Sequence, residues 1–110
     1  MICRMWRGWT APAHADAYER YLKGELFPRL EAELTSKGYR GYHLLRLEKG
    51  SETEFVTLVW FESLASVQSF AGPNYKIPVI SEKARGWLVR YVERCEHYEL
   101  SGFDWSPPAG

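Results

Sequence analysis

The spacing of apolar side chains along the chain predicts four β-strands. Apolar residues recur at every second position over residues 2–9, 39–48, 54–62 and 88–99. This period is typical of strands, because successive side chains of a strand point to opposite faces of a sheet. The segment 54–62 is apolar on both of its faces, which indicates a central strand that is covered on both sides.

Two helices are expected between these strands. From residue 13 to 34 large apolar side chains recur every four residues, as in an amphipathic helix. Pro28 removes a backbone donor within this helix, so a kink or a split is expected near residues 24–28. Ser63 is a suitable N-cap for a second, short helix, and one more helical turn is expected over 81–85.

The order β-α-β-β-α-β predicts a ferredoxin-like α+β fold, which is a four-stranded antiparallel sheet with both helices on one face. The chain has 110 residues, a length that suits one domain, and we place this domain at residues 1–100. The Gly- and Pro-rich segment 101–110 is expected to be a tail. It is either a loose extension or an arm that lies on a partner molecule through Phe103 and Trp105.

The predicted topology leaves one face of the sheet uncovered. We expect an apolar patch on that face, made by Trp6, Val56, Leu58 and Trp60. A monomer rarely exposes an apolar patch of several hundred Å², so such a patch usually marks an interface. The sequence therefore predicts a homodimer that closes sheet on sheet.

Composition and charge narrow the class of protein. The 14 basic and 14 acidic residues are scattered and cancel, so no nucleic acid partner is expected. No apolar run is long enough to span a membrane, and two widely separated cysteines suit reduced thiols in a cytoplasmic protein. Aromatic residues make up 15% of the chain, so their side chains must be buried in the core, at a ligand or against a second copy.

Five segments of the chain form a recognisable pattern. They are the first strand, which ends in WRGW, the long tyrosine-rich helix, and the segments GYRGYHLLRLEKG, EFVTLVWFESLASVQSFAGPNY and ERCEHYEL. Together they resemble the antibiotic biosynthesis monooxygenase domain of the dimeric α/β-barrel superfamily. The similarity covers about residues 1–100, and its most specific stretch runs from Phe55 to Tyr75. Within the family the chain is most similar to the single-domain branch.

The resemblance implies a dimer of face-to-face sheets, with a cavity in each protomer between its sheet and its helices. It also implies oxidation of a small aromatic or quinol-like compound by dioxygen, without an added cofactor or metal. The protein's share in such a reaction is to bind the ring, to help remove a phenolic proton and to stabilise the oxyanion.

Two positions depart from the expected pattern, one from that of the family and one from that of its quinol-oxidising members. A Trp commonly precedes the Glu-Ser pair that caps the second helix, but here Phe61 stands at that place. Trp60 is one residue early, which puts its side chain on the opposite face of the strand. Thr57 stands where an Asn lies in those enzymes, and its hydroxyl can form a hydrogen bond but is a weaker polariser of a substrate oxygen.

Haem degradation, another activity of the superfamily, is disfavoured. That branch has an Asn in the first strand and a His ligand after the second helix. Here Arg7 stands at or next to the place of that Asn, and none of the three histidines lies between Pro73 and Arg85.

Three residues are candidates for the chemistry. Arg7 shares a face of the first strand with Trp9 and could hold an enolate or a phenolate. His97 lies on the last strand, next to the first, and could act as a general base near neutral pH. Tyr75 could donate a hydrogen bond into the cavity. The structural alternatives are a salt-bridged arginine, a half-buried histidine with satisfied hydrogen bonds, and a tyrosine that only packs.

The other expected cavity residues would contact the substrate. They are Trp9, Tyr18, Leu22, Thr57, Phe61, Phe70 and Tyr91. If these side chains fill the space themselves, no pocket exists. Two further functions therefore stay open: a non-oxidative isomerase or cyclase of the same superfamily, and a non-catalytic dimer that binds a small ligand.

Overall fold

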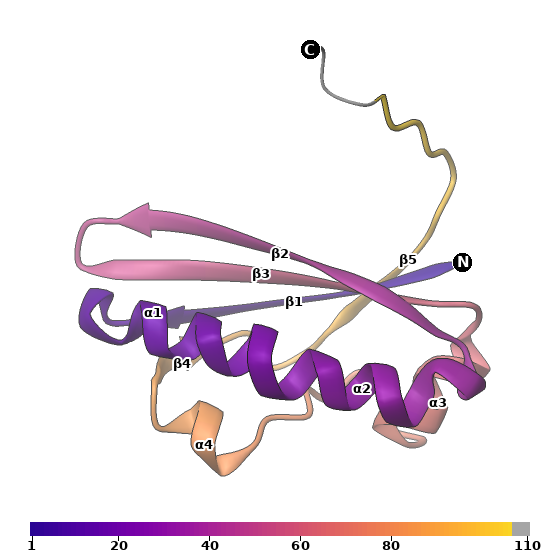
Figure 1. The fold of residues 1–110 in the computed structure, drawn as a ribbon, viewed down its shortest axis with the longest axis horizontal. Helices are drawn as coiled ribbons and strands as arrows, with labels where there is room; N and C mark the ends of the chain where they lie inside the picture. Colours follow the sequence, from indigo (N-terminus) through magenta and orange to yellow (C-terminus); the bar gives the residue numbers. More distant parts are fainter. Residues whose placement is uncertain (107–110) are drawn as a thin grey trace.

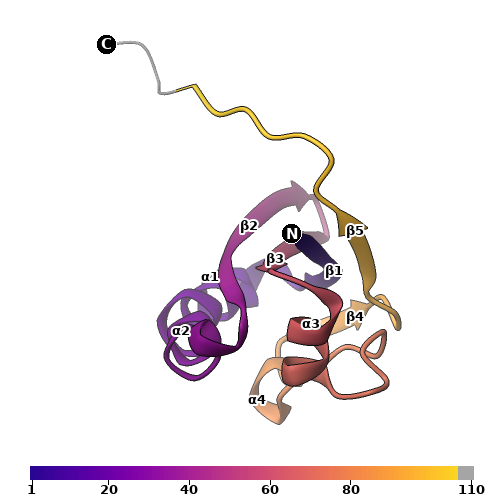
Figure 2. The same ribbon diagram turned by 90° about the vertical axis from the view of Figure 1, so that its right-hand side faces the viewer.

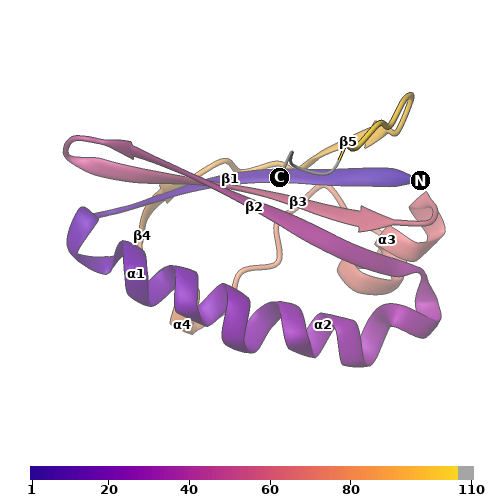
Figure 3. The ribbon, with the colours of Figure 1, turned by 45° about the horizontal axis from the view of Figure 1, so that its top comes forward.

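An antiparallel sheet forms one layer of the molecule and the helices form the other (Figure 1). The computed structural model describes residues 1–106. The strands are β1 (Ile2–Thr10), β2 (Tyr39–Lys49), β3 (Glu52–Phe61), β4 (Leu88–Tyr91) and β5 (Glu96–Glu99). They follow the order β2-β3-β1-β4, and β5 also pairs with β1. This arrangement confirms the predicted α+β fold, with helices on one face of the sheet (Figure 3).

The register between β1 and β3 decides which side chains face the helices. Residues that pair across an antiparallel sheet point to the same face. Trp6 pairs with Thr57, whereas Arg7 pairs with Val56. Thr57 is buried together with the other odd-numbered residues of β3. The even-numbered residues of β1 therefore point toward the helices, and its odd-numbered residues point to the open face.

The prediction that Trp6 lies on the open face is wrong. Its ring lies toward the helices over Gly8, where an added Cβ would be 2.8 Å from the ring. The indole Nε1 donates to the carbonyl of Val92 at 3.0 Å. Both faces of β1 carry large side chains, so alternation alone cannot tell them apart. The other three residues of the predicted patch, Val56, Leu58 and Trp60, do lie on the open face.

The long helix is continuous but changes its winding in the middle. It consists of α1 (Pro12–Tyr21), the π-helical turn η1 (Leu22–Leu26), α2 (Phe27–Leu34) and the 3₁₀ turn η2 (Thr35–Lys37). The predicted disturbance near 24–28 is thus a wide turn rather than a break, and it accommodates Pro28, which has no N–H to donate. The helical segment ends at Gly38, as its left-handed backbone conformation requires (φ +104°).

The shorter helices lie on the same face of the sheet, beside the long one (Figure 2). The predicted N-cap of α3 (Leu64–Ala71) is confirmed, because the Ser63 hydroxyl accepts a hydrogen bond from the backbone N–H of Ser66 at 3.2 Å. The short helix α4 (Glu82–Arg85) follows an irregular segment, 72–81.

The last strand is divided, although the sequence predicts one strand over 88–99. Two residues of β1, Trp6 and Arg7, lie opposite the four residues 92–95. The backbone N–H of Val92 donates to the carbonyl of Arg7 at 3.0 Å, and that of Cys95 to the carbonyl of Lys76 at 2.7 Å. This bulge separates β4 from β5.

The tail leaves the sheet after β5 and extends away from it (Figure 2). Residues 101–106 have no regular secondary structure, and the side chains of Phe103 and Trp105 are about three-quarters exposed, at 75% and 74%. The rest of the predicted tail, 107–110, lies outside the described residues. Within residues 1–106 no helix has the length and apolar character needed to cross a membrane.

Candidate functional site

A cavity of about 740 Å³ lies between the sheet and the helices. The long helix forms one wall, with Tyr18, Leu22 and Leu30 among its side chains. The segment 78–84 forms the opposite wall, and Thr57 of β3 contributes to the floor. The volume and the apolar lining of this cavity are typical of a site that binds a small organic molecule.

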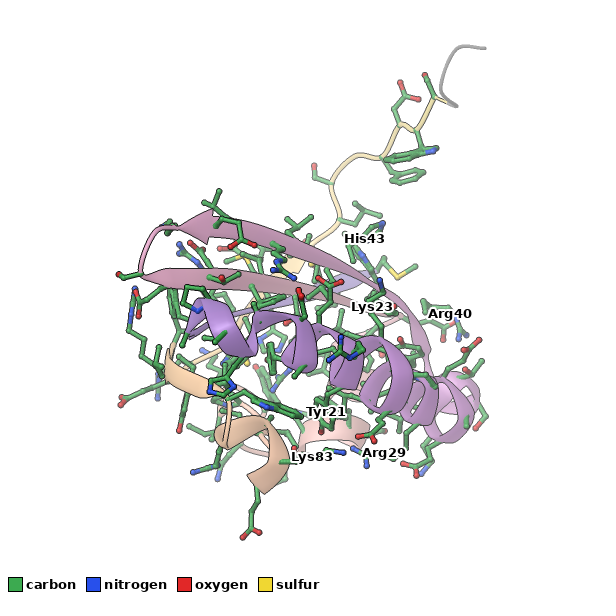
Figure 4. All side chains as sticks on the ribbon, turned by 60° about the vertical axis from the view of Figure 1, so that its left-hand side comes forward. Tyr21, Lys23, Arg29, Arg40, His43 and Lys83 are labelled. Atoms are coloured by element: carbon green, nitrogen blue, oxygen red, sulfur yellow. The ribbon has the colours of Figure 1, made fainter. Side chains whose placement is uncertain are left out.

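Two contacts join the walls of this cavity. The hydroxyls of Tyr21, on α1, and Ser81 lie 2.7 Å apart. Lys83 forms an ion pair with Glu25 at 2.9 Å. Figure 4 shows Tyr21 and Lys83, together with Arg29, on the side of the long helix that faces α4. Ser81, which precedes α4, and Lys83 of α4 are therefore both attached to the long helix through their side chains.

Arg4 is the charged residue of the sheet that lines the cavity, and only 4% of its surface is exposed. Its Nη1 donates to the carbonyl of Tyr75, and its Nη2 donates to the carbonyl of Ile77 at 3.2 Å. Nη1 also lies 3.0 Å from Nε2 of His97. The ring of Phe70 covers the guanidinium, with its centroid 5.5 Å from Cζ.

The positive charge of Arg4 has no carboxylate partner within residues 1–106. Burial lowers the pKa of Arg4, and the nearby thiol of Cys95 opposes that shift only in part. An arginine stays protonated at neutral pH nonetheless. The cavity wall therefore carries a cation that is surrounded by backbone carbonyls and aromatic rings.

His97 is neutral in this environment. A guanidinium can only donate, so Nε2 of His97 accepts from Arg4 and the proton lies on Nδ1. That Nδ1 is buried without a hydrogen-bond partner. Burial, then the charges of Arg4 and Lys76, lowers the pKa of His97 to about 4. The lone pair that a general base would use is thus directed at Arg4, and this geometry suits a residue that positions Arg4.

Four of the residues expected at the cavity line it: Tyr18, Leu22, Thr57 and Phe70. Tyr18 is almost fully buried, and burial raises the pKa of its hydroxyl. Phe61 also faces the helices, but it is fully buried behind Phe70, with ring centroids 6.0 Å apart. Phe61 therefore packs behind a residue of the cavity wall and does not line the cavity itself.

Arg7 and Trp9 do not face this cavity, because odd-numbered residues of β1 point to the open face. Arg7 pairs there with Glu54 at 3.2 Å. The ring of Trp9 lies near Arg7 and beneath Arg90, whose Cζ is 3.8 Å from the ring centroid. The prediction that Arg7 and Trp9 contribute to the cavity is therefore wrong, because both lie on the open face of the sheet.

Tyr75 and Tyr91 lie beside the cavity rather than in its wall. The backbone carbonyl of Tyr75 accepts from Arg4, and its ring packs edge-on against His97 at 5.0 Å. The ring of Tyr91 packs against Trp6, with centroids 5.9 Å apart.

Sequence reasoning missed Arg4, Trp6 and Cys95, all of which line the cavity. Arg4 stands between Ile2 and Trp6 on one face of β1, and a charged residue between apolar neighbours of a buried face is the signal that could have identified it. Cys95 reaches the cavity from the bulge that separates β4 from β5. Residues 92–95 contain no Gly or Pro, so the sequence does not predict this bulge.

The comparisons with known proteins identify the fold. No family model matches the sequence, and no curated protein matches it significantly. Among solved structures, the chain is similar to the crystal structure of a "Putative Antibiotic Biosythesis Monooxygenase" from Bacillus cereus, with a TM-score of 0.64 and 10% sequence identity over 98% of both chains. This likeness confirms the fold that the sequence resemblance implied.

Proposed function

We propose that the protein is a monooxygenase that oxidises a small aromatic or quinol-like compound with dioxygen and without an added cofactor. The observation that carries the proposal is the cavity of about 740 Å³ between sheet and helices. It occurs in a fold shared with the structure described as a "Putative Antibiotic Biosythesis Monooxygenase". Its size and apolar walls suit a flat ring system of two or three fused rings.

The reaction class needs no reductant other than the substrate. An anthrone-like compound loses two hydrogens from carbon and gains a carbonyl oxygen, while the second atom of dioxygen leaves as water. The substrate loses four electrons and dioxygen gains them. The protein binds the ring and stabilises the enolate or phenolate that donates electrons. We assign that stabilisation to Arg4, since Arg4 rather than Arg7 lines the cavity.

We further propose that two copies of the chain assemble through the open face of the sheet. Leu45 and Leu47 of β2 are 52% and 54% exposed, and they pair with Val56 and Glu54 of β3 on that face. Together with Leu58 and Trp60 they form an apolar surface, which a second copy would remove from water.

Oxygen uptake with a panel of naphthols and anthrones tests the proposed chemistry. We expect one dioxygen consumed per substrate oxidised. Leu26 lines the cavity, so Leu26→Trp fills part of it and should lower kcat/KM at least tenfold. Leu64 lies on α3 and is 43% exposed, so Leu64→Trp is the matched control and should leave kcat/KM unchanged.

Turnover of a substrate without oxygen uptake would contradict the oxidation and favour an isomerase or cyclase. Binding without any turnover would favour a ligand-binding protein.

A further inference from the structure

We propose that the ligand of the cavity carries a negatively charged oxygen and that Arg4 binds it. The inference rests on the proposed use of this cavity by an aromatic compound, and it narrows that compound to an anion. The ligand is either an aromatic carboxylate or a phenolate. Both classes carry an ionised oxygen on a flat apolar ring system.

Arg4 is a cation whose side chain is almost fully buried. A buried cation is costly unless a counter-charge lies beside it, which is why buried arginines are usually paired with carboxylates. Within residues 1–106 the side-chain donors of Arg4 meet two backbone carbonyls and one histidine nitrogen. These are dipoles, and none of them carries the opposite charge.

Cys95 is the ionisable group beside Arg4 that could supply a negative charge, and it does not do so. Burial raises the pKa of the Cys95 thiol, and the attraction of Arg4 offsets this only in part. The thiol is therefore protonated at neutral pH. His97 is neutral as well, so the guanidinium stays uncompensated until an anion enters the cavity.

Arg4 has more N–H donors than the protein groups around it use within residues 1–106. A guanidinium has five N–H donors in one plane. The contacts to Tyr75, Ile77 and His97 account for three of them. Within residues 1–106 the other two N–H groups have no acceptor and are open to a ligand, and a guanidinium binds an ionised oxygen through such groups more strongly than a neutral one.

Arg4 lies among both apolar and charged residues that line the cavity. Trp6, Val59 and Phe70 line the same cavity and offer apolar surface to a ring. The charged residues at the exposed end of the cavity are Arg29, Lys37 and Glu33. With Arg4 they amount to three positive charges against one negative, which favours the entry of an anion.

A binding titration tests the proposal without any turnover. The ligands are 2-naphthoate, its neutral analogue 2-naphthamide, and 4-nitro-1-naphthol, a phenol that is ionised at neutral pH. We expect the wild type to bind at least one of the two anions at least tenfold more tightly than the amide. The tighter of the two anions distinguishes the carboxylate from the phenolate.

Two variants separate Arg4 from the other cations. Arg4→Met keeps an unbranched side chain of similar length without charge, and it should reduce the preference for the anion to less than twofold. Arg20→Met removes an exposed cation of α1 that does not line the cavity, and it should change that preference by less than twofold. Equal binding of amide and anions by the wild type, or an undiminished preference in Arg4→Met, would overturn the proposal.

A crystal structure of the wild type with 6-bromo-2-naphthoate gives the answer even if Arg4→Met does not fold. The bromine identifies the orientation of the ring. We expect the carboxylate within hydrogen-bond distance of Arg4, about 3 Å. A carboxylate that points toward Arg29 would overturn the proposal. Neither experiment measures oxidation. A failure of the proposed oxygenase activity would therefore leave these binding results intact, and a failure of anion binding would not by itself exclude oxygenase activity.

Discussion

The burial of His97, together with the nearby charge of Arg4, makes the stability of the fold depend on pH. The folded state holds the pKa of His97 at about 4, below the ordinary value of 6.5. Below pH 6.5 the unfolded chain therefore takes up a proton that the folded chain resists. Stability that is complete above pH 6.5 is lost as the pH falls toward 4.

We expect this loss to be on the order of 1–2 kcal/mol, after allowance for the partial exposure of the ring. Urea unfolding at pH 7.5, 5.5 and 4.5 measures it. In His97→Gln the loss of stability between pH 7.5 and 4.5 should be smaller by about that amount. His14→Gln, an exposed position on α1, is the control and should unfold like the wild type. An unchanged pH dependence in His97→Gln would show that the folded state does not resist protonation of this ring.

The positions of the site residues could be predicted from the sequence only in part. Alternation in β1 correctly separates Arg4 and Trp6 from Arg7 and Trp9, but large side chains occupy both faces. Only the pairing of Trp6 with Thr57 identifies the face beneath the helices. The contacts of Arg4 with Tyr75 and His97 join residues more than 70 positions apart, and no local pattern predicts them.

At the scale of elements, the turn between the long helix and β2 depends on one glycine. Gly38 has φ +104°, and a Cβ at this position would lie 2.0 Å from Oγ of Ser66. Gly41 has a similar φ of +117°, but a Cβ there would meet no atom within 4 Å. The two positions therefore share the backbone requirement and differ in their surroundings.

We expect Gly41→Ala to cost about 1–2 kcal/mol, the strain of a left-handed alanine. Gly38→Ala should cost a further 1–3 kcal/mol or so, because the added methyl group overlaps Ser66 and separates α3 from the turn. Chemical unfolding of both variants measures the difference. Equal losses in the two variants would mean that α3 moves aside freely.

Most elements could be predicted because their signals are local. The caps of α3 and α4 and the period of the long helix are all visible within a few residues of sequence. The division between β4 and β5 could not be predicted, since residues 92–95 contain no Gly or Pro. The bulge is held by backbone contacts with Arg7 and Lys76, which are distant in sequence. The π-helical turn was visible only as the disturbance expected around Pro28.

At the scale of the whole molecule, the open face of the sheet should hold two copies together. We expect sedimentation at micromolar concentration to show a dimer. Leu45→Asp places a charge on that face, at a side chain already half exposed, so it should give a folded monomer. Leu64→Asp, on α3, is the control and should stay dimeric. A monomeric wild type, or a dimeric Leu45→Asp variant, would contradict this interface.

In the proposed function, the space between sheet and helices receives an aromatic ligand. Methyl NMR of the wild type during separate titrations with 2-naphthoate and 4-nitro-1-naphthol tests this binding, because buried methyl groups report ring currents close by. With at least one of these ligands we expect shifts at Leu22, Leu30 and Val59, which line the cavity, and none at Leu45 and Leu47 on the open face. Shifts confined to Leu45 and Leu47, or no shifts at all, would contradict it.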